Sequence, residues 1–194
     1  MPHLDSQIES WIFEHFFLNV EISSALWVHI HIFEITLRDF LNYSLVKLHS
    51  RSDWWNFPNL LAKRDLARIK KVEAVENLRK VDSFSISRMS LSFWISLLTK
   101  RYHQKIWRKL EFPNAPEDKL FRDEFHDKAH EILALRNLIA HQKNILNRNL
   151  IRDHAYLHEL TALLDPQLAD EVQKRSRVLD LLLNARLVGS GGGI

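Results

Sequence analysis

The distribution of glycine constrains this chain more than any other feature. All four glycines lie between positions 189 and 193, so the first 188 residues contain none. Tight turns with positive φ angles favour glycine, and β-hairpins depend on such turns, so the sequence argues against a fold rich in hairpins. Apart from Pro2, the prolines separate stretches with helical apolar spacing, at positions 58, 113, 116 and 166. We therefore predict an all-α fold.

Apolar residues that recur every three or four positions predict a bundle of about six to seven helices in a single domain, residues 1–188. The expected helices cover about 5–18, 20–49, 59–80, 90–110, 117–146, 149–164 and 166–187. Asn149 and Asp165 are expected N-caps, with Pro166 at the first position of the last helix. The glycine-rich tail 189–194 is expected to be flexible and resembles a cloning remnant.

Composition limits the classes of protein to consider. Hydrophobic residues make up 46% and charged residues 26%, as in ordinary globular proteins, and no apolar run approaches the ~20 residues of a membrane span. The N-terminal stretch MPHLDSQIESWIFEHFF lacks the basic region and cleavage site of a secretory signal, so we expect a cytoplasmic protein that spans no membrane. Because the chain has no cysteine, disulfides, thiolate metal sites and a cysteine nucleophile are excluded.

Charge is unevenly distributed along the chain. The formal net charge is +3, yet residues 1–58 carry seven acidic against three basic side chains, which leaves the later part cationic. The acidic residues are Asp5, Glu9, Glu14, Glu21, Glu34, Asp39 and Asp53, and the basic ones are Arg38, Lys47 and Arg51. A cationic region permits an anionic partner, although an ordinary solvated surface gives the same imbalance.

The segment ALRNLIAHQKN, residues 134–144, contains the most informative polar pattern. On a helix, Leu135 and Ile139 point toward the core, whereas Asn137 and His141 lie about 100° and 140° from Arg136 on the other side. A cation, an amide and an imidazole thus share one arc. Two interpretations remain open, a functional site and the ordinary polar face of an amphipathic helix, because Arg148 to His154 and Arg152 to His158 show the same Arg-x4-6-His spacing.

The longer segment LRNLIAHQKNILNRNL resembles the Arg-x4-6-His signature of the HEPN superfamily (higher eukaryotes and prokaryotes nucleotide-binding domains). Its Abi-like (abortive infection) branch also has an early helix similar to NVEISSALWVHIHIFEITLRDFLNYSL, a tryptophan pair such as Trp54 and Trp55, and a middle block similar to SLSFWISLLTKRYHQKIW. The three blocks cover most of residues 19–150 in the same order. Two positions depart from the pattern: Asp39 stands where asparagine is expected, and Gln142 where many relatives have a second histidine.

The resemblance implies a helical, often dimeric, metal-independent ribonuclease, whose active site forms where two motif helices meet. Cleavage through the RNA 2′-OH needs proton transfer and stabilisation of the phosphorane. His141 is expected to transfer protons, Arg136 to hold non-bridging oxygens, and Asn137 to orient the imidazole or donate to the phosphate. No cofactor is expected.

Further polar residues are candidates for RNA contacts. Those expected to bind RNA are Lys143, Asn144, Arg148, Lys100, Arg101 and Lys105. The segment KRYHQKIWRK combines cations with aromatic rings, as in single-strand binding surfaces, although Trp107 fits a core position equally well. Glu34 and Arg38 form an i, i+4 pair that either lies on the surface or braces the motif helix. Four histidines (His29, His31, His126 and His130) do not converge with a third ligand, so no metal site is expected.

Three functions from different classes follow. The first is an endoribonuclease in phage defence or a toxin, which acts on RNA as a homodimer and has an antitoxin or defence partner. The second is a non-catalytic HEPN module that binds RNA, a nucleotide or a protein. The third, a DNA-binding helical protein, lacks an identifiable recognition helix.

Overall fold

The structure is a computed structural model that describes residues 2–75, 86, 88–114 and 121–190. Within these residues it contains seven α-helices and no strand, which confirms the predicted all-α bundle. The α-helices are α1 (Pro2–His49), α2 (Lys63–Val75), α4 (Leu91–Ser96), α5 (Phe121–Ala140), α6 (Leu150–Leu164), α7 (Pro166–Lys174) and α8 (Val178–Ser190). Three short 3-10 turns, Trp54–Asn56, Lys100–Tyr102 and Trp107–Lys109, lie between them.

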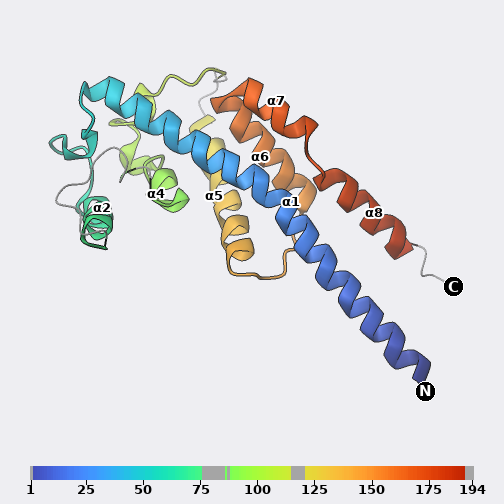
Figure 1. Cartoon of the computed structure of the whole chain (residues 1–194). Helices are drawn as coiled ribbons and strands as arrows, with labels where there is room; N and C mark the ends of the chain where they lie inside the picture. The colour runs from blue at the N-terminus through green and yellow to red at the C-terminus, as the bar shows by residue number, and fades with distance from the viewer. Residues whose placement is uncertain (1, 76–85, 87, 115–120, 191–194) are drawn as a thin grey trace.

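Helix α1 is the central element of the fold (Figure 1). Helices α4, α5, α6 and α8 pack against it, and α6 also packs against α5 and α7. One line of α1 side chains is fully buried in this core: Ile22, Leu26, Ile30, Phe33, Leu37, Leu41 and Leu45. Their spacing of three or four residues keeps them on one face of the helix, as the sequence predicted.

The prediction of two helices, at about 5–18 and 20–49, was wrong, because α1 runs without a break from Pro2 to His49. No glycine or proline lies between Pro2 and Pro58 to interrupt it. After α1 the chain turns sharply, and Trp54 and Trp55 are buried at this corner. The Trp54 indole donates a hydrogen bond to Asn42 Oδ1 at 2.9 Å, so the tryptophan pair packs the corner at the end of α1.

The segment 90–110, predicted as one helix, contains only α4 followed by two 3-10 turns. Hydroxyl side chains explain the early end of α4. Ser96 Oγ donates to the Phe93 carbonyl at 2.6 Å, and Thr99 Oγ1 donates to the Ser96 carbonyl at 2.9 Å, so both compete with the helical pattern. Trp107 in the last turn is buried, and it therefore belongs to the core.

The last predicted helix, 166–187, is two helices, α7 and α8. Its predicted start is confirmed, because Asp165 caps α7 by accepting from Leu168 N–H at 2.9 Å. The break occurs at Ser176, whose hydroxyl lies within hydrogen-bond distance of two imidazoles and accepts from Val178 N–H at 3.3 Å. Helix α8 includes Gly189 and Ser190, which were expected in the flexible tail, and residues 191–194 lie outside the described residues.

Other boundaries agree with the sequence more closely. Asn149 caps α6, since its Oδ1 accepts from Arg152 N–H at 3.1 Å. Helix α2 begins at Lys63 and is described to Val75, and the predicted continuation over 76–80 lies outside the described residues. The predicted motif helix, 117–146, is described from Phe121 and ends at Ala140.

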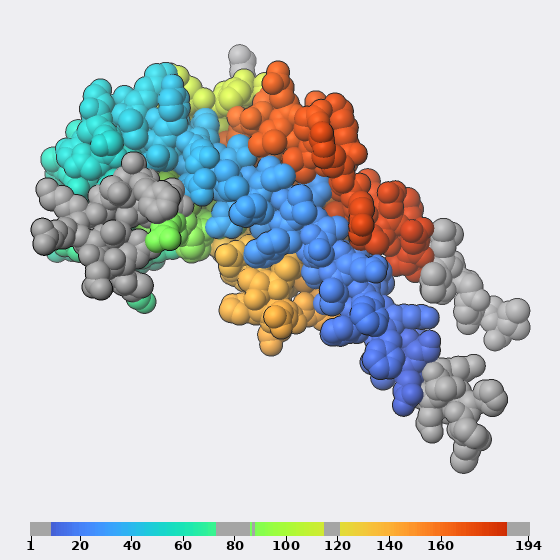
Figure 2. All heavy atoms as spheres, in the orientation of Figure 1, coloured from blue at the N-terminus to red at the C-terminus, as the bar shows by residue number. Residues whose placement is uncertain are grey.

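The N-terminal part of α1 projects beyond the helices that pack on its middle (Figure 2). Large apolar side chains in this part are exposed, among them Trp11, Phe13, Phe16 and Phe17, each more than half exposed. By length and composition alone, Glu9–His49 is long and apolar enough to cross a membrane, although core helices pass the same test. The most apolar stretch of this segment is 28% buried within the structure.

Candidate functional site

Arg136 lies near the end of α5, and two side chains of α1 hold it. Its Nε lies 3.8 Å from Glu34 Oε2, and its guanidinium carbon lies 5.7 Å from the centre of the Trp27 ring. Glu34 is itself fixed, because its Oε1 accepts from Leu91 N–H at 3.0 Å. The Arg136 side chain is 31% exposed. It is therefore a partly buried cation with a defined orientation.

The contacts of Arg136 leave its donor groups incompletely used. Its Nε is buried and has no hydrogen-bond partner among the described residues. The separation from Glu34 exceeds the length of a hydrogen bond, and a ring face accepts no ordinary N–H bond. A buried guanidinium donor without a partner is costly in free energy. Because Nε itself is closed to solvent, an anionic oxygen would have to bind the exposed part of the side chain.

Asn137 and His141 are exposed beside Arg136, as the predicted helical rotation requires. His141 is the C-terminal cap of α5, since its backbone N–H still donates to the Asn137 carbonyl at 3.1 Å. The structure thus brings the three predicted residues to one end of one helix. Arg136 lies deepest, whereas Asn137 and His141 face outward.

The end of α5 has the hydrogen-bond pattern of a Schellman motif. Gln142 N–H donates to the Ile139 carbonyl and Lys143 N–H to the Leu138 carbonyl, both at 2.9 Å. This pattern needs a left-handed residue after the cap, and Gln142 takes that role with a φ of 54°. Glycine usually occupies such a position, so the backbone is strained directly after His141. The prediction that the helix continues to residue 146 was wrong for this reason.

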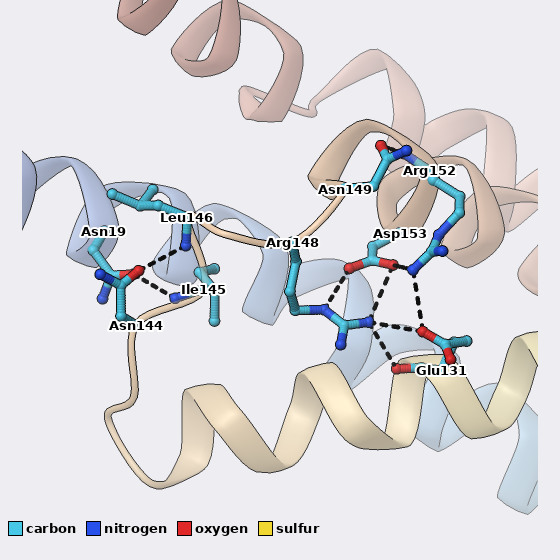
Figure 3. Close-up of polar contacts among 9 residues, drawn as sticks. All are labelled: Asn19, Glu131, Asn144, Ile145, Leu146, Arg148, Asn149, Arg152 and Asp153. Carbon is cyan, nitrogen blue, oxygen red and sulfur yellow. Dashed lines mark hydrogen bonds and ion pairs between the residues drawn. The ribbon is translucent and has the colours of Figure 1, made fainter.

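The loop after α5 is anchored to the first half of α1 (Figure 3). Asn19 Oδ1 accepts from the N–H of the buried Ile145 at 2.9 Å. Asn144, a predicted RNA-binding residue, uses its Oδ1 to accept from Leu146 N–H at 2.8 Å. Lys143, predicted for the same role, is exposed and lies next to the strained turn. The loop therefore keeps Lys143 available and fixes the backbone around it.

Arg148, another predicted RNA-binding residue, lies in an ion-pair network (Figure 3). Its Nε donates to Asp153 Oδ2 at 2.8 Å, and its Nη2 donates to Glu131 Oε2 at 3.1 Å. Arg152 contacts the same two carboxylates, each at 3.1 Å. The Asp153 side chain is fully buried, so Arg148 compensates a charge inside the protein. These hydrogen bonds raise the pKa of Arg148, and they give it a structural role that joins α5 to α6.

The remaining predicted RNA-binding residues, Lys100, Arg101 and Lys105, are exposed but lie toward the other end of α5. The Leu98 carbonyl accepts from Arg122, and Trp107 packs on Phe121 and Phe125 in the first turns of that helix. A helix of 20 residues is about 30 Å long. The fold therefore places Lys100, Arg101 and Lys105 far from His141.

Two hollows of the described structure lie away from Arg136, Asn137 and His141. One, of about 460 Å³, lies between α1 and α7 and is lined by His29, Arg175 and Ser176 among others. The other, of about 600 Å³, lies between α1, the start of α6 and α8. Asn137 and His141 are themselves exposed, so the candidate site is an open surface on a single chain.

A second polar cluster was not predicted. Ser176 Oγ lies 2.9 Å from His29 Nε2 and 3.0 Å from His154 Nε2, and the two rings pack edge to face at 4.7 Å. Burial, and then the neighbouring His154 and His158, lower the pKa of His29 from 6.5 to about 4. Burial and His158 also lower the pKa of His154. The cluster links α1, α6 and the α7–α8 junction through neutral imidazoles.

No group of three or more His, Asp or Glu side chains in the described part of the chain is arranged to hold a metal ion. The His126 and His130 rings are 5.7 Å apart, but no third ligand joins them. The chain matches no protein-family model, no curated protein and no solved structure. The fold and the site together define an all-α bundle in which a partly buried Arg136 lies beside exposed Asn137 and His141 at the end of one helix.

Proposed function

We propose that the end of α5 is the active centre of a metal-independent endoribonuclease of the HEPN type. The observation that carries this proposal is the state of Arg136, which is oriented by Trp27 and Glu34, retains a buried unpaired Nε, and lies next to exposed Asn137 and His141. A partly exposed guanidinium of fixed orientation suits an anionic oxygen, and a nearby imidazole suits proton transfer.

In the proposed reaction the RNA 2′-OH attacks the adjacent phosphorus. A base removes the proton of the 2′-OH, the P–O5′ bond breaks, and the leaving 5′-oxygen takes up a proton. The products are a 2′,3′-cyclic phosphate and a free 5′-OH. His141 exchanges the protons, Arg136 stabilises the charge on the phosphorane, and Asn137 positions the imidazole or donates to the phosphate. Lys143 contributes a further positive charge beside them.

The active enzyme in this proposal is a homodimer. On one chain Asn137 and His141 are exposed, so a bound phosphate would remain open to water on its outer side. A second copy would cover that side and contribute its own Arg136 or His141 to the same phosphate. As an RNA-cleaving protein the chain would act in the cytoplasm, in phage defence or as a toxin held inactive by an antitoxin.

The direct test is incubation of the purified chain with total RNA in excess EDTA. We expect cleavage by the wild-type chain, products that end in 2′,3′-cyclic phosphate, and no cleavage by the Arg136→Ala/His141→Ala variant. The matched control is His130→Ala/Arg177→Ala, which removes an exposed histidine and an exposed arginine elsewhere. Cleavage that stops in EDTA and returns with magnesium would contradict the mechanism.

The alternative is a HEPN module that binds RNA, a nucleotide or a protein without cleaving it. Its support is the open surface, which a single chain does not close around a substrate. The same experiment decides between them: RNA that is retained by the protein but remains intact, and that is released by the double variant, would favour the binding module.

A further inference from the structure

Two segments that are distant in the sequence form one basic surface of the fold. Residues 57–71 and 98–110 contain ten of the 27 basic side chains of the chain but only one of its 24 acidic side chains, Asp65. Asp65 is fully buried and accepts from the Tyr102 hydroxyl at 2.6 Å, so it places no carboxylate on the surface. Nine of the ten basic side chains are exposed: Lys63, Arg64, Lys70, Lys71, Lys100, Arg101, Lys105, Arg108 and Lys109.

Three hydrogen bonds hold the two segments side by side. The Tyr102 hydroxyl accepts from Ala62 N–H at 2.9 Å and donates to Asp65, and the Lys105 ammonium group donates to the Asn59 carbonyl. The exposed cations of both segments therefore lie on neighbouring parts of one surface, at the C-terminal end of α1 where α2 also lies (Figure 1). We call the following set the cationic corner: Lys63, Arg64, Lys100, Arg101 and Lys105.

Carboxylates do not neutralise the cationic corner. Among the described residues, Arg64 is the only member that approaches an acidic side chain, with 3.7 Å between its Nε and the buried Asp65 Oδ1. Cations on other faces of the described chain have exposed partners, as in the pairs Lys128 with Glu159 and Lys174 with Glu171. A cluster of one sign creates a positive potential that attracts anionic partners.

An exposed aromatic pair adjoins the cationic corner. Phe57, two residues before Asn59, is 41% exposed, and its ring packs on His49 with 4.2 Å between the ring centres. Burial, and then the charges of Lys109 and Arg51, lower the pKa of His49, so its ring is neutral at pH 7 although cations surround it. The surface thus combines a stacking platform with positive charge.

This combination suits RNA better than a lipid surface. Phe57 is the only large hydrophobic side chain exposed in residues 57–71 and 98–110, so the surface lacks the broad apolar face that amphipathic helices bury in membranes. Unpaired bases stack on aromatic rings whatever their identity, while their phosphates contact lysine and arginine. A double helix keeps its bases paired inside, so the surface fits a single strand.

We propose that the cationic corner, together with Phe57 and His49, binds single-stranded RNA at a surface separate from the end of α5. The corner contacts the phosphates, and one unpaired base stacks on the Phe57 ring. The sequence predicts RNA contacts for Lys100, Arg101 and Lys105, and this proposal gives them a surface of their own. The binding step does not require cleavage.

The distance to His141 sets a minimum length for RNA that reaches both surfaces. The Leu98 carbonyl, two residues before Lys100, accepts from Arg122 at the start of α5, and His141 directly follows the other end of this helix of 20 residues. The helix is about 30 Å long, and a stacked strand rises ~3.4 Å per nucleotide, so roughly nine nucleotides span the gap. This step rests on the proposed function, and it predicts that short RNA is a poor substrate.

Fluorescence anisotropy tests the charge contacts. The probe is a fluorescein-labelled 2′-O-methyl oligouridylate of about 20 nucleotides, which lacks the 2′-OH needed for cleavage. The charge variant Lys63→Gln/Lys100→Gln/Arg101→Gln should bind at least ~10-fold more weakly, and the slope of log K against log salt concentration should become shallower by about 2.

The matched control removes three exposed charges beside the middle of α1, in Lys174→Gln/Arg175→Gln/Arg177→Gln. It should bind almost as tightly as the wild-type chain. Equal losses in both variants would overturn the proposal, because net charge alone would then explain the binding. A wild-type chain that binds poly-glutamate or anionic phospholipid vesicles but not the oligonucleotide would also overturn it.

Substitutions of Phe57 test the stacking contact. Phe57→Leu should weaken binding by on the order of 10-fold, and Phe57→Trp should retain it, because stacking requires an aromatic ring. Trp11→Leu is the control, since Trp11 is 57% exposed at the other end of α1. If Phe57→Leu binds as tightly as the wild-type chain, the stacking platform is excluded.

The two proposals fail separately in these experiments. The Arg136→Ala/His141→Ala variant should still bind the probe through the cationic corner, although it cleaves no RNA. If the wild-type chain binds through the corner and cleaves no RNA, only the ribonuclease assignment fails. If the chain cleaves RNA and its charge variant binds and cleaves long RNA as the wild-type chain does, only the proposal for the corner fails.

Discussion

Glu34 and Arg136 face each other across α1 and α5, with 3.8 Å between Oε2 and Nε. The distance is short enough for electrostatic attraction and too long for a hydrogen bond. Glu34 is held in place by the backbone N–H of Leu91, so it acts as a fixed negative charge. It orients the guanidinium and leaves its N–H donors unoccupied. A tight bidentate ion pair would occupy them.

The first prediction concerns the separate roles of Arg136 and His141. Arg136→Ala and His141→Ala should each reduce the RNA cleavage rate by ~10²-fold or more, because charge stabilisation and proton transfer contribute factors of this order. Arg136→Lys should remain impaired, since an ammonium group cannot bind two oxygens in one plane. Initial rates are measured on a defined RNA, with circular dichroism as the check on folding. His130→Ala is the control, and a folded His141→Ala with the wild-type rate would exclude its catalytic role.

The second prediction is a pH dependence of stability from the buried histidine cluster. The pKa of His29 in the folded chain, about 4, lies below the ordinary 6.5, so the unfolded chain binds more protons between these values. This contribution to stability is complete above about pH 6.5 and decreases as the pH falls toward 4. The slope is at most about 1.4 kcal/mol per pH unit for one proton.

Urea unfolding at several pH values between 7.5 and 4.5 measures this slope. His29→Gln keeps a donor and an acceptor for Ser176 but does not titrate, so its slope should be smaller than that of the wild-type chain. The pKa of His154 is also lowered, so the stability of His29→Gln should still depend on pH to a smaller extent. His130→Gln, an exposed control, should behave as wild type. Equal slopes for wild type and His29→Gln would contradict the assignment.

The third prediction is that Gln142→Gly stabilises the fold. Gln142 has a φ of 54°, a conformation that costs a side-chain-bearing residue about 1 kcal/mol and glycine almost nothing. The free energy of unfolding should rise by about 0.5–1 kcal/mol in urea titrations. Gln142→Ala keeps a β-carbon and should give no such gain. A glycine variant no more stable than the alanine variant would show that the turn is not strained.

The fourth prediction separates a structural from an RNA-binding role for Arg148. Arg148→Met leaves the buried Asp153 carboxylate with less compensation and should lower the free energy of unfolding by about 3 kcal/mol. Arg152→Met should cost less than about 1 kcal/mol, because Arg152 is 41% exposed. Both are measured by urea unfolding, together with RNA affinity. If Arg148→Met is as stable as the wild-type chain but binds RNA more weakly, the result would support the predicted contact of Arg148 with RNA and contradict its structural role.

The sequence predicts the parts of the site that a single helix determines. Helical rotation placed Leu135 in the core and Asn137 and His141 outside, and the structure agrees. Where helices start was also predictable, because Asn149 and Asp165 are caps with local hydrogen bonds. These features depend on residues only a few positions apart, so a pattern in the sequence contains the necessary information.

The remaining features depend on contacts between distant segments. The sequence suggested Arg38 as a partner of Glu34, and the structure brings Glu34 to Arg136, which favours the bracing role. Nothing in the sequence indicated that Trp27 contacts Arg136 or that Ser176 contacts two histidines. The end of α5 was missed for a local reason: the left-handed residue is a glutamine, and the usual sequence signal is glycine.

The continuous α1 has a consequence for how the chain is synthesised. A ribosome releases this helix first; α4 and α5 follow only after Leu91, and α6 and α8, which complete its cover, only after Leu150. At about 5–20 residues per second, roughly 100 intervening residues take roughly 5–20 s. Until these helices have all been made, the core line of α1 is incompletely covered, so the nascent helix presents apolar side chains that chaperones of hydrophobic segments would bind. The chain is therefore most prone to aggregate while it is being made.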